Sequence, residues 1–223
     1  MAKMRLLMKK EGMASFISHL DLMRTMRRAF IRADIPLRHS EGFNPHPVMA
    51  FALPLSVCHE SNCELLDFEP LVPIGTDVFK RLCNALPEGL EVLEIYDSAR
   101  KFGGVRWLEV QLTLTYDGGV PTSGKPEVDA VAMLEKHFSS PLIIHKRTKR
   151  GEADLDILPM INGITFTVQD NTSLTVRAVI SAQNPTLNPA GIVDAISQLE
   201  GFAPDMAEFR RVEVYDEDLI VFR

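Results

Sequence analysis

Two kinds of hydrophobic spacing follow one another along this chain. Apolar residues at every second position predict strands, most clearly at residues 107–116 (WLEVQLTLTY) and again at 163–170 and 173–181. Apolar residues three or four positions apart predict amphipathic helices, most clearly at residues 15–36 and 188–202. The chain is therefore expected to fold as a mixed α+β protein.

The helix predicted within residues 15–36 (SFISHLDLMRTMRRAFIRADIP) has signals at both ends. Ser18 is a suitable N-cap, Asp21 follows at nearly capping-box spacing, and Pro36 terminates the pattern. The expected apolar face comprises Leu22, Met23, Met26, Ala29, Phe30 and Ala33. The opposite face is expected to carry Arg24, Arg27, Arg28 and Arg32 to solvent.

The first hundred residues predict the order β-α-β-β-α-β. The expected elements are a strand at 4–12 in which Arg5, Leu7 and Lys9 alternate with Leu6 and Met8, the basic helix, strands near 48–53 and 63–69, a helix at 73–86 and a strand at 89–98. For the second helix we predict Thr76 as the N-cap, with Val78, Phe79, Leu82 and Leu86 facing inward.

The second half predicts a related order, with strands near 107–116, 142–149, 163–170, 173–181 and 209–216 and helices at 127–138 and 188–202. Two such halves predict two tandem ferredoxin-like sandwiches with the order β-α-β-β-α-β, at residues 1–100 and 101–223. The boundary is placed near residues 98–106 (SARKFGGVR).

Composition agrees with a globular protein and limits its environment. No apolar run approaches the roughly 18 residues of a membrane span, and the first twelve residues lack a signal-peptide core. The three cysteines, Cys58, Cys63 and Cys83, lack the CxxC spacing of zinc or redox sites. We therefore expect reduced thiols, a cytoplasmic location and no membrane partner.

Charge is distributed unevenly along the chain. The net charge is −6, yet residues 1–50 hold nine Lys or Arg against four Asp or Glu, a net +5, so the remainder carries −11. A basic end on an acidic body fits a localised anionic partner such as RNA. A solvated helix face, whose arginines pair with acidic residues elsewhere, is the alternative.

Common cofactor motifs are absent from the sequence. There is no GxxxxGK[ST] phosphate loop, no dinucleotide fingerprint, no GxSxG elbow, no HExxH helix and no iron–sulfur cysteine cluster. We therefore expect neither a cofactor nor a metal site.

The segment 40–47 (SEGFNPHP) is a stiff polar loop directly after the basic helix. Each residue before proline is pushed toward extended geometry, so the loop loses little entropy on meeting a ligand. Phe43 can stack on a base, and Asn44 can hydrogen-bond to it. His19, Glu41 and His46 are the candidate acid–base groups. A purely structural connection, a recognition surface and a catalytic site all remain open for this loop, as a capping role does for His19.

Further cations flank these elements. Lys9 and Lys10 precede the basic helix and join Arg24, Arg27, Arg28 and Arg32 as candidate anion-binding residues. Lys146 and Arg147 belong to a second charged segment, 145–159, for which a phosphate-binding finger and a solvated hairpin are the two interpretations.

Residues 16–55, with LDILP at 155–159 and NPAGIVDAI at 188–196, resemble an uncharacterised bacterial family. Its members occur as the C-terminal part of cobalamin-binding radical-SAM proteins or as separate proteins linked to them. This chain lacks the CxxxCxxC cluster and a cobalamin motif, so the resemblance implies a stand-alone accessory form. The tandem order is also similar to that of CRISPR RNA-processing proteins, which is an analogy of fold alone.

These observations predict an accessory binding protein that recognises RNA, or an RNA-containing assembly, for modification by a radical-SAM partner. A metal-independent RNA-processing enzyme using His19, Glu41 and His46 is one alternative. A protein-only adaptor, in which the arginine helix docks on the partner enzyme, is the other.

Overall fold

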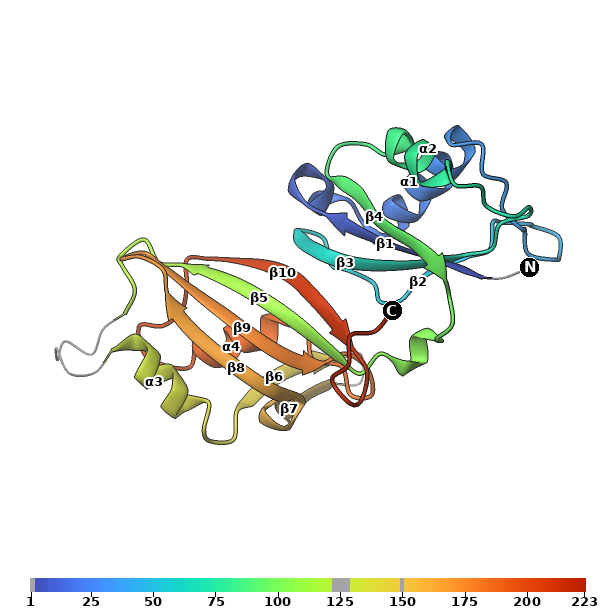
Figure 1. Cartoon of the computed structure of the whole chain (residues 1–223). Helices are drawn as coiled ribbons and strands as arrows, with labels where there is room; N and C mark the ends of the chain where they lie inside the picture. Colours follow the sequence, from blue (N-terminus) through green and yellow to red (C-terminus); the bar gives the residue numbers. More distant parts are fainter. Residues whose placement is uncertain (1–2, 122–128, 149–150) are drawn as a thin grey trace. The chain divides into compact units, whose positions relative to one another are not determined.

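The computed structural model describes residues 3–121, 129–148 and 151–223 (Figure 1). By internal contacts the chain forms two compact units. Unit 1 contains Met1–Gly104 together with Phe222–Arg223, and unit 2 is Val105–Val221. The expectation of a mixed α+β protein is confirmed, since both units combine helices with antiparallel strands. Nothing in the sequence indicates that Phe222 and Arg223 belong to unit 1 rather than to unit 2.

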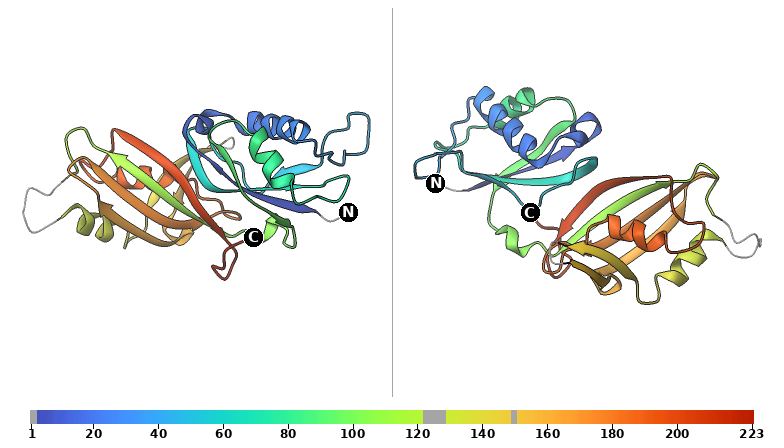
Figure 2. Two further views of the ribbon diagram at one scale, coloured as in Figure 1. Left: turned by 45° about the horizontal axis from the view of Figure 1, so that its top comes forward. Right: turned by 180° about the vertical axis from the view of Figure 1, so that it is seen from behind.

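Unit 1 is a four-stranded antiparallel sheet with two helices on one face (Figures 1 and 2). Its elements are β1 (Met4–Lys10), α1 (His19–Arg32), β2 (Met49–Phe51), β3 (His59–Phe68), α2 (Val78–Ala85) and β4 (Leu90–Asp97), with short 3-10 turns at Gly12–Phe16 and Phe102–Gly104. The strand order is β4-β1-β3-β2, so β1 and β3 are central.

The predicted character of α1 is confirmed. The Ser18 hydroxyl accepts a hydrogen bond from the backbone N–H of Asp21 and donates one to its carboxylate. The hydrogen bond from Ser18 and a second from Arg24 lower the pKa of Asp21. The predicted apolar face is buried except at Met23, which is half-buried, and Phe30 packs on Phe68 of β3 with ring centroids 4.8 Å apart. This contact anchors α1 on the central strand.

The second helix differs from its prediction at two positions. The N-cap is Asp77 rather than Thr76, and its side chain makes no capping hydrogen bond. Val78 and Leu82 are buried as expected, but Phe79 is 43% exposed. The N-cap lies one residue later than predicted, and in an eight-residue helix only a narrow stripe faces the core.

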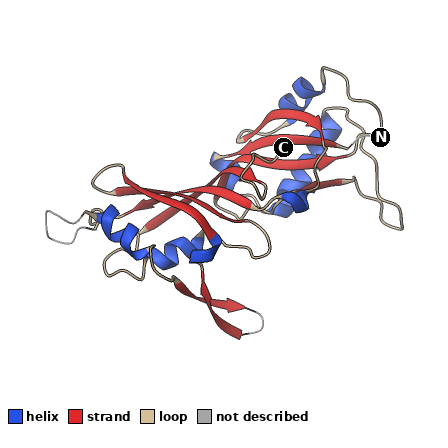
Figure 3. Ribbon diagram, turned by 60° about the horizontal axis from the view of Figure 1, so that its bottom comes forward, coloured by secondary structure: helices blue, strands red, loops and turns tan. Residues whose placement is uncertain are grey.

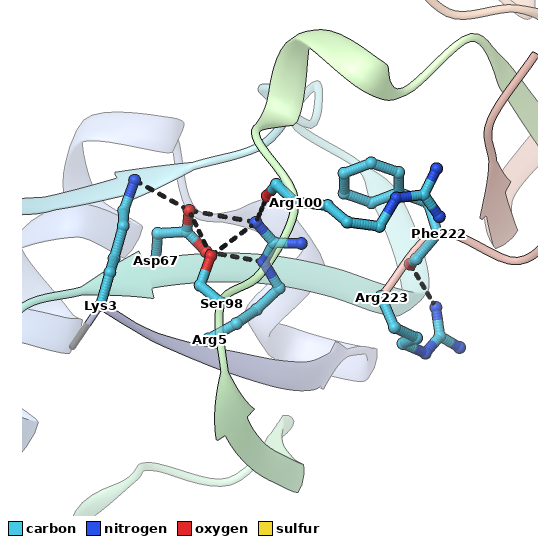
Figure 4. Close-up of polar contacts among 7 residues, drawn as sticks. All are labelled: Lys3, Arg5, Asp67, Ser98, Arg100, Phe222 and Arg223. Atoms are coloured by element: carbon cyan, nitrogen blue, oxygen red, sulfur yellow. Dashed lines mark hydrogen bonds and ion pairs between the residues drawn. The ribbon is translucent and has the colours of Figure 1, made fainter.

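A buried ion pair joins the neighbouring strands β1 and β3 of unit 1 (Figure 4). Arg5 and Asp67 are 0% and 1% exposed, and Nε of Arg5 donates to the Asp67 carboxylate at 2.7 Å. The Nη2 atom of Arg5 reaches Asp67, the Ser98 hydroxyl and the backbone oxygen of Arg100. The alternation in the first strand did not indicate that Arg5 would be buried; consecutive residues of β1 are buried, so side chains on both of its faces are shielded from solvent.

Aromatic rings enclose the same guanidinium. The Arg5 carbon Cζ lies 4.5 Å from the centroid of Phe102 and 5.1 Å from that of Phe222. Arg100 lies over Phe222 as well, at 4.5 Å. Phe222 is fully buried, and Gly104 lies so close to it that an added Cβ would meet its ring at 3.2 Å. The C-terminal residues therefore complete the core of unit 1.

Unit 2 also has a four-stranded antiparallel sheet covered by helices on one face (Figure 1). Its elements are β5 (Trp107–Thr115), α3 (Ala130–His137), β6 (Ile143–Thr148), β7 (Gly151–Asp156), β8 (Ile161–Val168), β9 (Ser173–Ser181), α4 (Ala190–Ile196) and β10 (Met206–Tyr215), with a 3-10 turn at Leu158–Met160. The sheet order is β10-β5-β9-β8. The strict alternation of β5 appears directly in its burial, which changes at every residue.

The charged segment 145–159 contributes to a separate two-stranded hairpin of β6 and β7 (Figure 3). His145 and Asp154 face each other across it, with Nδ1 and Oδ1 2.6 Å apart. This arrangement agrees with the interpretation of the segment as a hairpin, although β7 was not among the strands predicted one by one. Within the described parts of the chain, no helix has the length and apolar character to span a bilayer.

Candidate nucleic-acid interface

A hollow of about 380 Å³ opens in unit 1 between the end of α1 and the segment that follows it. Its walls are mainly apolar and include Phe30 and Ile31 of α1, the Ile35–Leu37 turn and Leu71. Arg27, Asp34 and His39 supply the polar groups. The hollow joins the two features that the sequence singled out, because Arg27 comes from the basic helix, whereas His39 and Pro47 flank the polar loop.

The polar loop is held closed by hydrogen bonds across its base. The backbone N–H of Ser40 donates to the oxygen of His46 at 2.9 Å, and the N–H of His46 donates to the Ser40 hydroxyl at 3.2 Å. Val48 donates to the oxygen of Arg38 one step further out. Gly42 has φ +121°, which a side chain would strain. The loop is therefore pre-organised, as its prolines predicted.

The tip of this loop presents its side chains to solvent. Phe43 is completely exposed, and Asn44 and His46 are exposed beside it. Among the exposed large hydrophobic side chains of the described chain, Phe43 has the highest exposed fraction. The geometry makes Phe43 available for stacking on a partner.

Most of the predicted basic residues are engaged within unit 1. Nζ of Lys9 lies 3.5 Å from Oε2 of Glu91, and Nη1 of Arg24 lies 2.9 Å from Oδ1 of Asp21. Lys10 is buried, with Nζ donating to the backbone oxygen of Ser15. Arg32 donates to the oxygen of Ala85. The structure therefore does not bring all of these cations into one basic cavity.

Two arginines of α1 differ from the others. Arg28 is exposed and makes no hydrogen bond or ion pair with any residue that the structure describes. Arg27 lines the hollow, and its Nε is shielded from solvent with no hydrogen-bond partner in the described chain. An unpaired buried donor carries a desolvation cost that an acceptor bound at the guanidinium would offset. Arg27 is therefore the arginine in the wall of the hollow, and Arg28, the next residue along α1, is exposed outside its lining.

The candidate acid–base groups are not brought together. Nδ1 of His46 lies 3.1 Å from the Ser40 hydroxyl and 3.2 Å from the oxygen of Asn44. The ring of His19 packs edge-on against Phe51, with centroids 5.7 Å apart. No contact of Glu41 with either histidine is seen in the described residues. Their arrangement offers no assembled acid–base pair.

Other predicted residues lie away from the hollow or outside the description. Lys146 and Arg147 belong to the backbone of β6, but their side chains lie outside the described residues, as does the hairpin tip at 149–150. In the described chain, no group of three His, Cys, Asp or Glu side chains is placed to share a metal ion.

Sequence reasoning missed the apolar walls of the hollow. Ile31 and Leu71 are 76% and 52% exposed, although both are large and aliphatic. Ile31 falls outside the apolar face expected for α1. A large aliphatic residue on the polar side of a helix is a sequence signal for an exposed apolar surface.

Comparisons with known proteins give distant likenesses and one family. No curated protein sequence matches the chain. An unknown protein from Galdieria sulphuraria is 9% identical, covering 95% of this chain and 98% of its own, with a TM-score of 0.26. Thermus thermophilus Cse3, bound to an RNA representing a pre-cleavage complex, is 14% identical. The match covers 93% of this chain and 98% of the Cse3 chain, with a TM-score of 0.19. At such TM-scores neither likeness carries an argument.

The sequence profile of one family covers most of the chain, from residue 3 to residue 189. This span includes the basic helix, the polar loop and the hollow, together with most of unit 2. The chain therefore belongs to the bacterial family described as "Uncharacterized protein conserved in bacteria (DUF2344)".

Proposed function

We propose that this protein is an accessory binding module that recognises RNA through unit 1. The observation that carries the proposal is the hollow beside a pre-organised loop, with Arg27 in its wall and Phe43 exposed nearby on the loop. An apolar hollow accepts an unstacked base, the two arginines supply charge for the flanking phosphates, and Phe43 adds a stacking surface. The reduced number of available cations favours a short single-stranded element over a long duplex.

The proposal is tested by measuring RNA retention with charge-reversed variants. The double variant Arg27→Glu/Arg28→Glu is expected to bind single-stranded RNA at least tenfold more weakly. Its log–log salt slope is expected to be smaller by about 1.4, because two phosphate contacts are lost at roughly 0.7 each. Filter binding of fluorescent RNA between 50 and 200 mM salt measures both quantities.

The matched control is Lys136→Glu/Arg177→Glu in unit 2, which makes the same change in net charge at two exposed positions that do not line the hollow. If both double variants lose affinity equally, net charge alone explains the binding and the hollow has no special role. If the wild type shows no salt-dependent retention at all, RNA recognition by this protein is rejected.

We further propose that each unit is a ferredoxin-like sandwich. The strand order β4-β1-β3-β2 in unit 1 supports this, as do its antiparallel neighbours and the two helices on one face. In unit 2 the order β10-β5-β9-β8 supports the same assignment if the β6–β7 hairpin is counted as an insertion after α3. The open faces of such sheets are common platforms for RNA.

The chemistry is proposed to reside in a radical-SAM partner with a cobalamin-binding domain. Support comes from the resemblance over residues 16–55, which contains α1 and the polar loop. The apolar walls of the hollow favour a second candidate function, a protein-only adaptor, because exposed Ile31 and Leu71 suit an apolar side chain of a partner.

Co-purification separates the two functions. Affinity capture of the tagged protein, with and without ribonuclease treatment, is expected to lose the radical-SAM partner after treatment if RNA bridges them. Ile31→Glu places a negative charge in the wall of the hollow and is expected to reduce capture of the partner under either function, so the response to ribonuclease makes the distinction. Retention of the partner after ribonuclease, together with its loss from Ile31→Glu, would instead establish the adaptor.

A further inference from the structure

A second cavity, of about 270 Å³, lies wholly within unit 2 at the start of β5. Trp107, the chain's only tryptophan, forms part of its wall together with Met160. The polar lining comes from Arg106, Asn184 and Glu217, with Ser181 and Gln183 beside them. This cavity is distinct from the hollow on α1, and none of its residues entered the function proposed above.

The backbone around the cavity is fixed by pairing with β9, by pairing with β10 and by a hydrogen bond from Ala182. Trp107 pairs with Ser181 of β9 and with Tyr215 of β10, so its position is set by two strand ladders. The N–H of Arg106 donates to the oxygen of Tyr215, and the oxygen of Arg106 accepts from Ala182. The backbone of Arg106 and Trp107, which lines the cavity, is therefore fixed in position before a ligand binds.

The segment that carries Asn184 is fixed in the same way. The Ser181 hydroxyl donates to the oxygen of Pro185 at 2.6 Å, and the Thr186 hydroxyl donates to that of Ala182 at 3.1 Å. Nε2 of Gln183 donates to the oxygen of Val105 at 3.2 Å. The amide of Asn184 is thus presented from an ordered segment rather than from a free loop.

Three polar side chains of this lining have no other role in the described structure. Arg106, Asn184 and Glu217 make no side-chain hydrogen bond or ion pair with any described residue. These groups differ in their hydrogen-bonding chemistry. The Glu217 carboxylate accepts, the Asn184 amide both donates and accepts, and the Arg106 guanidinium donates and carries a positive charge. All three lie in the same lining as the half-buried indole of Trp107. Such convergence of polar groups at the edge of an aromatic wall is typical of a small-ligand site.

We propose that this cavity binds a guanine nucleotide, with the base stacked on Trp107. The Watson–Crick edge of guanine presents two adjacent donors, N1–H and N2–H₂, which match the two oxygens of the Glu217 carboxylate. The Asn184 amide can donate to O6, and Arg106 can contact the phosphate. The cavity is at the small end of the range for ligand sites, which fits a single base rather than a larger cofactor.

The same groups disfavour the other bases. Adenine offers an acceptor at N1 where guanine offers a donor, so the carboxylate would face a lone pair. Uracil has a single N–H between two carbonyl oxygens, one of which would meet Glu217. Glu217 and Asn184 are exposed, so a mismatched base loses hydrogen bonds without a full desolvation penalty, and a preference for guanine of about tenfold is expected.

The sole tryptophan provides the test. Guanosine 5′-monophosphate (GMP) is expected to quench the fluorescence of the full chain saturably, with adenosine 5′-monophosphate about tenfold weaker. Glu217→Gln is expected to weaken GMP binding about tenfold and to reduce the preference for GMP. Arg106→Ala is expected to weaken GMP binding about tenfold while leaving guanosine unchanged, because only the nucleotide carries the phosphate.

Two controls separate this site from the hollow on α1. Free N-acetyltryptophanamide corrects for absorption and collisional quenching. Arg27→Glu/Arg28→Glu should bind GMP as the wild type does, so a failure of RNA recognition in unit 1 leaves this measurement intact. The proposal is overturned if GMP shows no saturable quenching up to 10 mM, or if Glu217→Gln binds both nucleotides as the wild type does.

Discussion

Replacing Asp67 with asparagine is expected to lower the free energy of unfolding of unit 1 by about 3–5 kcal/mol. The substitution keeps the shape of the side chain but leaves the Arg5 charge inside the sheet without its counter-ion, and the loss of one partner from a buried pair has this magnitude. The aromatic rings around Arg5 do not replace a carboxylate. Urea denaturation followed by far-ultraviolet circular dichroism measures the change.

Unit 1 offers a matched control in Arg38 and Glu69, which form the same kind of pair at the surface. Their side chains are 52% and 24% exposed, and the hydrogen bond from Arg38 lowers the pKa of Glu69. Glu69→Gln is expected to cost no more than about 1 kcal/mol, since water screens such pairs. A loss in Asp67→Asn no larger than in Glu69→Gln would contradict the prediction.

Removing both charges tests the reason for the effect. Arg5→Met/Asp67→Leu eliminates the stranded charge, and apolar replacement of a buried pair is often neutral. This double variant is therefore expected to be more stable than Asp67→Asn. Equal destabilisation of both would show that hydrogen bonds from Arg5 to Ser98 and to the Arg100 backbone matter more than the charge.

The second large effect is expected at Phe222, next to the end of the sequence. Phe222→Ala is expected to cost about 3–5 kcal/mol, as for other buried phenylalanines, because the ring is fully buried against Arg5 and Arg100. Differential scanning calorimetry at constant pH measures the loss as a lower Tm.

Phe43 supplies the control for this substitution, since it is the same residue type with full exposure. Phe43→Ala is expected to change the free energy of unfolding by less than about 0.5 kcal/mol. If both variants lost stability equally, burial would not explain the role of Phe222.

The candidate site was predictable in its parts but not in its arrangement. The proline-rich composition of residues 40–47 predicted a pre-organised loop, because proline restricts φ locally whatever surrounds it. Three of the candidate cations, Lys9 of β1 and Arg24 and Arg32 of α1, have partners within unit 1, namely Glu91, Asp21 and the backbone oxygen of Ala85. Of these, only the pairing of Arg24 with Asp21 is local, at i and i+3, and could have been anticipated.

By itself, the sequence determined which segments become helix or strand and which face of α1 is buried. Those properties depend on neighbours within a few residues, so periodicity and capping reveal them. Only the tertiary structure decided that Arg5 is buried with Asp67, 62 positions away, and that Phe222 closes the core of unit 1. Hydrophobic periodicity ranks a charged residue as outward-facing, and it carries no information about which distant residue will neutralise that charge.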